Sequence, residues 1–289
     1  MKKYIVGDVE VIRISEIVFH DFSASFLFPD WDANVLDDKL AWMTPGCVNK
    51  ARSMVTVNIH TWLLKTPKHI ILIDTGIGNG RTRTVPMFNQ LNTPYLERLA
   101  QAGVGVDQVD YVMCTHLHSD HVGWNTCRRD GKWVPTFPNA RYVFPQRELE
   151  QCQSRAREPA QAGGIYEDAI LPVLESQQVD LVGPEGGESI DGLTFYPTPG
   201  HTAGHMSIGL AAQGEQALFT GDVVHNPIQI YRPRWNSAFC EDAAQARSSR
   251  EWMLAYAVAK KALLFTAHFP ESSAGYIAAT EKGFDWRFA

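Results

Sequence analysis

The sequence predicts a layered α/β domain, because short apolar runs typical of strands are mixed with helical patterns along the whole chain. The chain has 289 residues, of which 45% are hydrophobic and 20% are charged, so it can bury a substantial core. No Pro-, Gly- or Ser-rich linker divides it. We therefore expect a single domain over residues 1–289.

The strands are predicted from short apolar runs. These runs cover residues 9–14, 54–64, 70–73, 111–114, 140–144, 193–196, 207–210, 217–219 and 263–266. Two helical patterns stand out between them. One helix begins at Thr93-Pro94, a cap residue followed by a proline in the first turn. Another covers about residues 241–261, where Trp252 and Tyr256 recur at helical spacing.

Composition and charge indicate where this protein is located and which kind of partner it binds. The N-terminus has two lysines but no long apolar run, which favours a first strand over a signal peptide. The five cysteines are scattered and form no CxxC pair, which indicates reduced thiols in a cytoplasmic protein. No stretch approaches the roughly 18 apolar residues of a membrane span. A formal charge of −6 without a basic cluster argues against nucleic acid, so we expect a small-molecule substrate.

Two segments without clear periodicity, residues 20–53 and 226–240, are interpreted as insertions. Both are rich in aromatic residues, which either pack local loops or a homodimer interface, or form the wall or lid of an apolar substrate pocket. The sequence leaves both roles open. The candidates for the substrate pocket are Trp31, Trp124, Tyr231 and Trp235.

The residues that follow the strand at 111–114 predict a metal site. They read Thr-His-Leu-His-Ser-Asp-His, so four metal-ligand side chains fall within six positions. Imidazole nitrogens and carboxylate oxygens suit zinc, iron or manganese. Three further candidates stand at or just after later strand-like runs. The full set is His116, His118, Asp120, His121, His201, Asp222 and His268. Seven ligands are too many for one tetrahedral ion and suit two ions that share a ligand.

This pattern resembles the metallo-β-lactamase superfamily, whose marks are HxHxDH followed by a His, an Asp and a His in that chain order. The match runs from Asp74 to His268. The resemblance implies a four-layer αββα sandwich with a dinuclear metal site at the edge where two sheets meet. Within the superfamily, the chain is most similar to the N-acyl homoserine lactonase and methyl parathion hydrolase branch.

The resemblance also implies how the ligands are divided. One ion takes His116, His118 and His201, the other takes Asp120, His121 and His268, and Asp222 bridges them. The expected cofactors are two divalent ions, with zinc first and iron or manganese as alternatives. Two such ions lower the pKa of a shared water, which supplies hydroxide at neutral pH.

Four further roles are expected near the ligands. Asp120 either orients the attacking water and shuttles its proton, or is a ligand alone. His225 takes the place of a tyrosine that touches the substrate oxygen in related lactonases. It therefore either contacts substrate, or supports a ligand or lies on the surface. Asp74 resembles the family aspartate that accepts a hydrogen bond from a ligand histidine. His205 is expected to hold the loop of His201.

The sequence therefore favours a dinuclear hydrolase that opens a lactone or cleaves a related carboxylic or phosphate ester. The alternatives are an iron-dependent oxidoreductase of the persulfide dioxygenase type, a β-lactam or thioester hydrolase, and a binding protein that keeps the fold without catalysis. An intact ligand set argues against the last of these.

Overall fold

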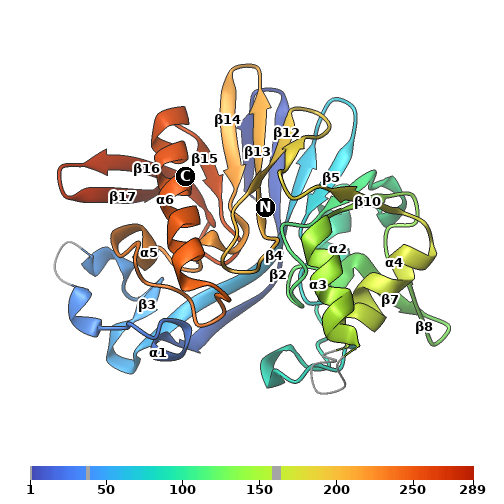
Figure 1. Cartoon of the computed structure of the whole chain (residues 1–289), viewed down its shortest axis with the longest axis horizontal. Helices are drawn as coiled ribbons and strands as arrows, with labels where there is room; N and C mark the ends of the chain where they lie inside the picture. Colours follow the sequence, from blue (N-terminus) through green and yellow to red (C-terminus); the bar gives the residue numbers. More distant parts are fainter. Residues whose placement is uncertain (1, 37–39, 158–163) are drawn as a thin grey trace.

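The computed structural model describes residues 2–36, 40–157 and 164–289, in which two mixed β-sheets face each other (Figure 1). The first sheet has the order β1-β2-β4-β5-β6-β9-β10, with β3 paired to β4. Its strands are β1 (Lys3–Val6), β2 (Val9–Ser23), β3 (Val48–Asn49), β4 (Met54–Lys65), β5 (Ile70–Ile73), β6 (Tyr111–Met113), β9 (Arg141–Pro145) and β10 (Val179–Val182). The pairs β5–β6, β6–β9 and β9–β10 are parallel.

The second sheet follows chain order from β11 to β17, and within it only β14 and β15 pair in parallel. Its strands are β11 (Gly187–Glu188), β12 (Leu193–Pro197), β13 (Met206–Ala212), β14 (Glu215–Phe219), β15 (Leu263–Phe265), β16 (Ala274–Thr280) and β17 (Gly283–Phe288). A separate hairpin is formed by β7 (Thr126–Arg129) and β8 (Lys132–Pro135).

Helices cover the outer face of each sheet. The helices are α1 (Ala24–Leu27), α2 (Tyr95–Gln101), α3 (Gln146–Ala156), α4 (Leu171–Glu175), α5 (Ile228–Tyr231) and α6 (Ala243–Lys260), and a π-helical turn covers Tyr166–Ile170. Figure 1 shows α2, α3 and α4 beside the first sheet and α6 beside the second. The predicted αββα sandwich is therefore confirmed. Among the helices that the structure describes, none is long and apolar enough to cross a membrane.

The core between the sheets is centred on aromatic rings. Phe265 of β15 stacks on Phe219 of β14 with ring centroids 4.8 Å apart, and Trp62 of β4 meets Phe265 at 4.7 Å. Both phenylalanines are fully buried. Each buried ring removes a large apolar surface from water, so these contacts hold the two sheets at a fixed spacing.

The sequence located the central strands but missed elements whose pattern is weak. Helix α3 is mostly polar and buries only Glu148 and Leu149, so its sequence has no apolar stripe that predicts a helix. The last hairpin, β16–β17, consists partly of alanine and exposed residues and carries little strand signal. Strand β2 continues past the predicted end at residue 14 to Ser23, with irregular register against β4 after Ser15.

The two segments interpreted as insertions pack against each other in their described parts, while residues 37–39 of the first lie outside the described residues. The backbone N–H of Ala238 donates to the carbonyl oxygen of Leu27 at 2.8 Å. Phe28 meets Trp235 with ring centroids 6.3 Å apart. These contacts place both segments at the same end of the sandwich.

Replacement of Phe265 by alanine is expected to lower the free energy of unfolding by about 3–5 kcal/mol, because it leaves a cavity between the sheets. Chemical denaturation measures this change. Tyr276→Ala is the matched control, since this ring on β16 is 40% exposed. It should change stability by only about 0.5 kcal/mol. An equal loss of unfolding free energy in the two variants would contradict the conclusion that the aromatic core stabilises the packing of the two sheets.

Candidate metal centre

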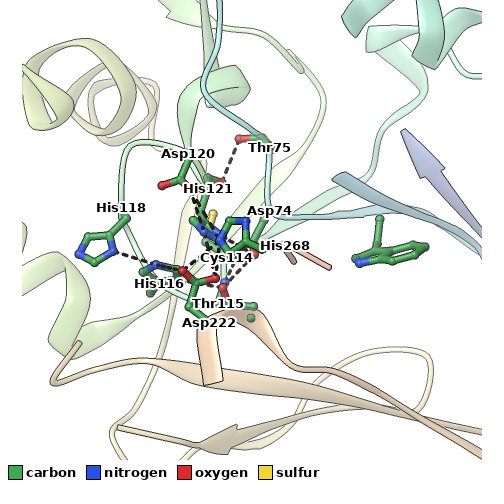
Figure 2. A network of polar contacts seen from close by, with 12 residues as sticks. Asp74, Thr75, Cys114, Thr115, His116, His118, Asp120, His121, Asp222 and His268 are labelled. Atoms are coloured by element: carbon green, nitrogen blue, oxygen red, sulfur yellow. Dashed lines mark hydrogen bonds and ion pairs between the residues drawn. The ribbon is translucent and has the colours of Figure 1, made fainter. Parts of the chain in front are cut away.

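The seven predicted ligands meet at one edge of the sandwich because each follows the end of a strand. The HxHxDH residues follow β6, His201 lies between β12 and β13, Asp222 follows β14, and His268 follows β15. The parallel pairing of β14 with β15 brings the last two of these loops to the same edge. Figure 2 shows His116, His121, His268 and Asp222 converging from these different segments.

Three histidines form one group of nitrogens. His118 Nδ1 lies 3.1 Å from His116 Nε2 and 2.9 Å from His201 Nε2. Burial lowers the pKa of His116 and of His201 well below the ordinary histidine value. Neutral rings present lone pairs, so three ring nitrogens converge on a small region as they do around a cation.

Asp120, His121 and His268 form a second group. His268 Nδ1 lies 2.9 Å from the carbonyl oxygen of Asn58, which can only accept, so the proton of a neutral His268 sits on Nδ1. His121 Nδ1 likewise faces Asp74 Oδ2 at 2.8 Å. The Nε2 atoms of both histidines are thereby turned toward the centre of the site.

Asp222 lies between the two groups. Its Oδ1 is 3.2 Å from His121 Nε2 and 3.0 Å from His268 Nε2, and its Oδ2 is 3.2 Å from His201 Nε2. Burial raises the pKa of Asp222, but the histidines around it, His121 foremost, lower it well below its usual range. Asp222 therefore stays a carboxylate in a region from which water is largely excluded.

The donor set fits divalent cations. His121 Nε2 and Asp222 Oδ1 are buried and have no hydrogen-bond partner among the described residues. A ring lone pair that faces a carboxylate oxygen is unfavourable unless positive charge lies between them. Burial lowers the pKa of His121, yet Asp222, Asp74 and Asp120 together raise it well above its usual value. The carboxylates thus attract positive charge, which a proton or a metal ion can supply.

Asp74 supports both His121 and the loop that carries it. Its Oδ1 accepts from the backbone N–H of Thr115 and its Oδ2 from the Thr115 hydroxyl, both at 2.8 Å. Together with the contact to His121, these bonds fix the direction of the imidazole (Figure 2). A hydrogen bond at the outer nitrogen of a metal-binding histidine sets its tautomer in the same way.

His205 holds the loop of Asp222 and has no free ring nitrogen. Its Nδ1 lies 3.1 Å from the carbonyl oxygen of Thr198, and its Nε2 accepts from the backbone N–H of Asp222 at 2.9 Å. Gly221, with φ of +51°, leaves room for this approach, because a Cβ there would lie 2.4 Å from His205 Nε2. A larger residue at position 221 would push Asp222 out of place.

His225 lies against the second group of ligands. Its ring stacks on that of His268 with centroids 5.4 Å apart, and its Nε2 is 3.3 Å from Asp222 Oδ2. Both ring nitrogens are buried and have no hydrogen-bond partner among the described residues. Burial lowers the pKa of His225, so a neutral ring with one N–H faces the pocket beside the ligands.

A pocket of about 980 Å³, which includes its part open to solvent, lies over the site. Its floor contains His118, Asp120, His201, Asp222, His225 and His268. Its apolar lining includes five phenylalanines, which are Phe19, Phe22, Phe26, Phe88 and Phe239. The rings of Phe22, Phe26 and Phe239 contact one another with centroids 5.9 to 6.5 Å apart. Phe26 and Phe239 belong to the two aromatic segments, whereas Phe19 and Phe88 carried no signal in the sequence.

The structure does not bring the four aromatic residues predicted for the substrate pocket to its walls. These residues are Trp31, Trp124, Tyr231 and Trp235. Trp124 turns into the core, where it stacks on Tyr95 with ring centroids 5.0 Å apart. Trp31 and Trp235 pack against each other at 5.8 Å, and the Tyr231 hydroxyl donates to Asp285 at 2.9 Å. All four make contacts outside the pocket lining, and phenylalanines line the pocket instead.

The fold and the ligand pattern define the class of this protein. The model of the metallo-beta-lactamase superfamily matches residues 55–268, and the chain belongs to that superfamily. This stretch begins within β4 and ends at His268, so it includes every predicted ligand.

Among curated proteins, the chain is similar to the uncharacterized protein YobT of Bacillus subtilis, with 28% identity over 57% of this chain and 61% of YobT. It is also similar to an N-acyl homoserine lactonase of Bacillus thuringiensis, with 26% identity over 62% of this chain and 67% of the lactonase. The lactonase AiiB of Agrobacterium fabrum is 22% identical over 86% of this chain and 93% of AiiB. The alignment with YobT thus spans less than two thirds of that relative.

Two solved structures share the fold over almost the whole chain. The hydrolase AbOPH of the beta lactamase superfamily has a TM-score of 0.81 and 26% identity, covering 99% of this chain and 96% of its own. The dizinc quorum-quenching lactonase AidC has a TM-score of 0.78 and 22% identity, covering 100% of this chain and 97% of its own. At that identity, the likeness to AidC supports the fold alone.

Replacement of Asp74 by asparagine is expected to weaken zinc binding by about 10- to 100-fold, because His121 loses the acceptor that fixes its ring. Zinc titration of metal-free protein against a chromophoric chelator measures this change. Asp191→Asn is the matched control, since Asp191 pairs with His69 at 2.8 Å outside the site. If zinc affinity is the same in Asp74→Asn as in the control, Asp74 does not support a ligand.

Proposed function

We propose that this chain is a dinuclear metal-dependent hydrolase that opens a lactone or cleaves a related carboxylic or phosphate ester. The position of Asp222 carries the proposal, because its two oxygens lie 3.2 Å from His201 Nε2 of one group and from His121 Nε2 of the other. A carboxylate in that position can serve two ions at once. The lactonase relatives support hydrolysis as the reaction class.

In this proposal His116, His118 and His201 hold one ion, Asp120, His121 and His268 hold the other, and Asp222 bridges them. The mixture of imidazole and carboxylate donors favours zinc, with iron and manganese as alternatives. When bound, a pair of divalent ions supplies Lewis acidity and a hydroxide nucleophile at neutral pH.

Asp120 and His225 are the proposed groups for proton movement and substrate contact. Asp120 Oδ2 lies 3.7 Å from His121 Nε2 and its carboxylate also lines the pocket, so it can orient a water and pass a proton to the leaving oxygen. The imidazole of His225 also lines the pocket, and neither ring nitrogen has a hydrogen-bond partner among the described residues. Its N–H can donate to an oxygen on which negative charge develops.

The pocket walls support a substrate with an apolar group next to the bond that is cleaved. Five phenylalanines line the pocket, and the charged and polar residues lie on its floor. An acyl chain or an aryl ring can pack on the phenylalanines while its ester or lactone group lies over the ligands. The relatives named N-acyl homoserine lactonases support a small-molecule substrate of this kind.

Other activities of the ligand set make different predictions. An iron-dependent oxidoreductase of the persulfide dioxygenase type would hold one iron and no second metal. A β-lactam or thioester hydrolase would differ in its substrate alone. The lactonase relatives favour hydrolysis of an ester or lactone over both. A cytoplasmic location and a homodimer stay predictions from the sequence.

Elemental analysis of protein purified without added metal tests the proposal directly, and two ions per chain are expected. A panel of lactones, aryl esters, thioesters, β-lactams and phosphotriesters then identifies the reaction. Asp222→Ala should lose at least one ion, because Asp222 contacts a histidine of each group. One iron without a second metal, or the absence of hydrolysis across the whole panel, would overturn the assignment.

Replacement of His225 by alanine is expected to lower turnover by at most about 10²- to 10³-fold, the range for loss of one donor to a developing oxyanion. Both ions should remain bound, because His225 is outside the proposed ligand set. His225→Tyr restores a donor and should recover part of the lactone hydrolysis. Metal content and kcat are measured on the same preparations. Unchanged kinetics in His225→Ala would exclude substrate contact, and loss of an ion would make His225 a ligand.

A further inference from the structure

A buried glutamate outside the proposed ligand set connects two of the ligand loops. Glu148 lies in the first turn of α3 and is 4% exposed. Its Oε2 accepts from the backbone N–H of Leu117 at 3.0 Å, and its Oε1 accepts from the backbone N–H of Gly204 at 2.9 Å. Both oxygens of one side chain are therefore used by two loops that are far apart in the sequence.

The two bonded positions lie beside the three-histidine group. Leu117 is the residue between His116 and His118, and Gly204 follows His201 by three positions. The first loop extends from the first sheet and the second loop from the second sheet. A backbone bond from Met206 to Thr115, with a length of 2.9 Å, joins the two loops at their bases. Glu148 joins them again next to the histidines.

Helix α3 packs closely against the loop that carries Gly204. A Cβ at Gly204 would lie 2.8 Å from both the backbone nitrogen and Oε1 of Glu148, so only glycine allows the helix to come this close. The same helix also contacts Glu241 through Gln151 and Arg155. Glu241 Oε2 accepts from the backbone N–H of Ala203 at 3.2 Å. The loop of His201 is thus held to α3 on two sides.

The second ligand group has supports of its own. His121 is held by Asp74, and His268 is held by the carbonyl of Asn58. Neither of these supports makes a hydrogen bond to Glu148 among the described residues. A change at Glu148 should therefore act mainly on the group formed by His116, His118 and His201.

We propose that Glu148 is a positioning residue that fixes the spacing of the loops carrying His116, His118 and His201, and so sets the cation affinity of that group. The inference rests on the proposed metal centre. Glutamine at this position keeps the size of the side chain but replaces one acceptor oxygen by an NH₂ donor. One of the two backbone N–H groups would then face a donor, and the bridge between the loops would be broken on one side.

The experiment measures zinc affinity in two backgrounds that isolate the groups. His268→Ala keeps the three-histidine group, and His118→Ala keeps the group of Asp120, His121 and His268. Adding Glu148→Gln should weaken zinc binding by about 10- to 100-fold in the first background, as for other groups that orient ligands, and by less than about 3-fold in the second. Zinc is titrated into metal-free protein against a chromophoric chelator, so no activity is needed.

Glu150→Gln is the matched control, because Glu150 lies on the same helix and is exposed. It should leave zinc affinity unchanged in both backgrounds, and thermal melts establish that every variant is folded. Equal affinity with and without Glu148→Gln, or an equal loss in both backgrounds, would overturn the positioning role. Wild-type protein that binds no zinc would reject the metal centre and the inference together. Wild-type protein that binds two ions while Glu148→Gln has no effect would reject the inference alone.

Discussion

The structure depends on one electrostatic constraint, which is a carboxylate buried among imidazole nitrogens. Asp222 is 4% exposed, and ring nitrogens of His121, His201 and His268 lie 3.0 to 3.2 Å from its oxygens. Burial of an unpaired charge is costly, so the carboxylate is stable only with positive charge beside it. Hydrogen bonds from surrounding residues hold the histidine rings and Asp222 in position. Asp74 and the carbonyl of Asn58 fix two of the rings, and His205 holds the backbone of Asp222.

The sandwich provides the rigid support that such a cluster needs. Each ligand loop starts at the end of a buried strand, and the strands are fixed by the aromatic core between the sheets. Because the two sheets contribute different predicted ligands, the spacing of the sheets influences the spacing of these side chains. Hydrogen bonds also join the two loops directly. Glu148 accepts from the backbone of both loops, and the backbone N–H of Met206 donates to the carbonyl oxygen of Thr115.

The ligand candidates could be recognised in the sequence because they are local features: donor side chains directly after apolar runs, in a fixed order. The pocket could not, because its walls depend on which side chains of distant segments face one another. Trp124 stands three residues after His121, yet it turns into the core and donates to the buried Glu16 at 2.7 Å. Phe88 lies far from every ligand in the chain and still reaches the pocket. Helix α3 was missed because it is mostly polar, and Glu148 is one of the two residues that it buries.

Several phenylalanines of the pocket and the predicted ligands that line it come from different stretches of chain. Phe22, Phe26 and Phe239 belong to segments that carry none of the seven predicted ligands, and Phe26 is 57% exposed. Exposed side chains tolerate substitution with little loss of stability. Under the proposed function, substitutions at these rings can therefore change which compounds the pocket accepts while the seven predicted ligands stay in place.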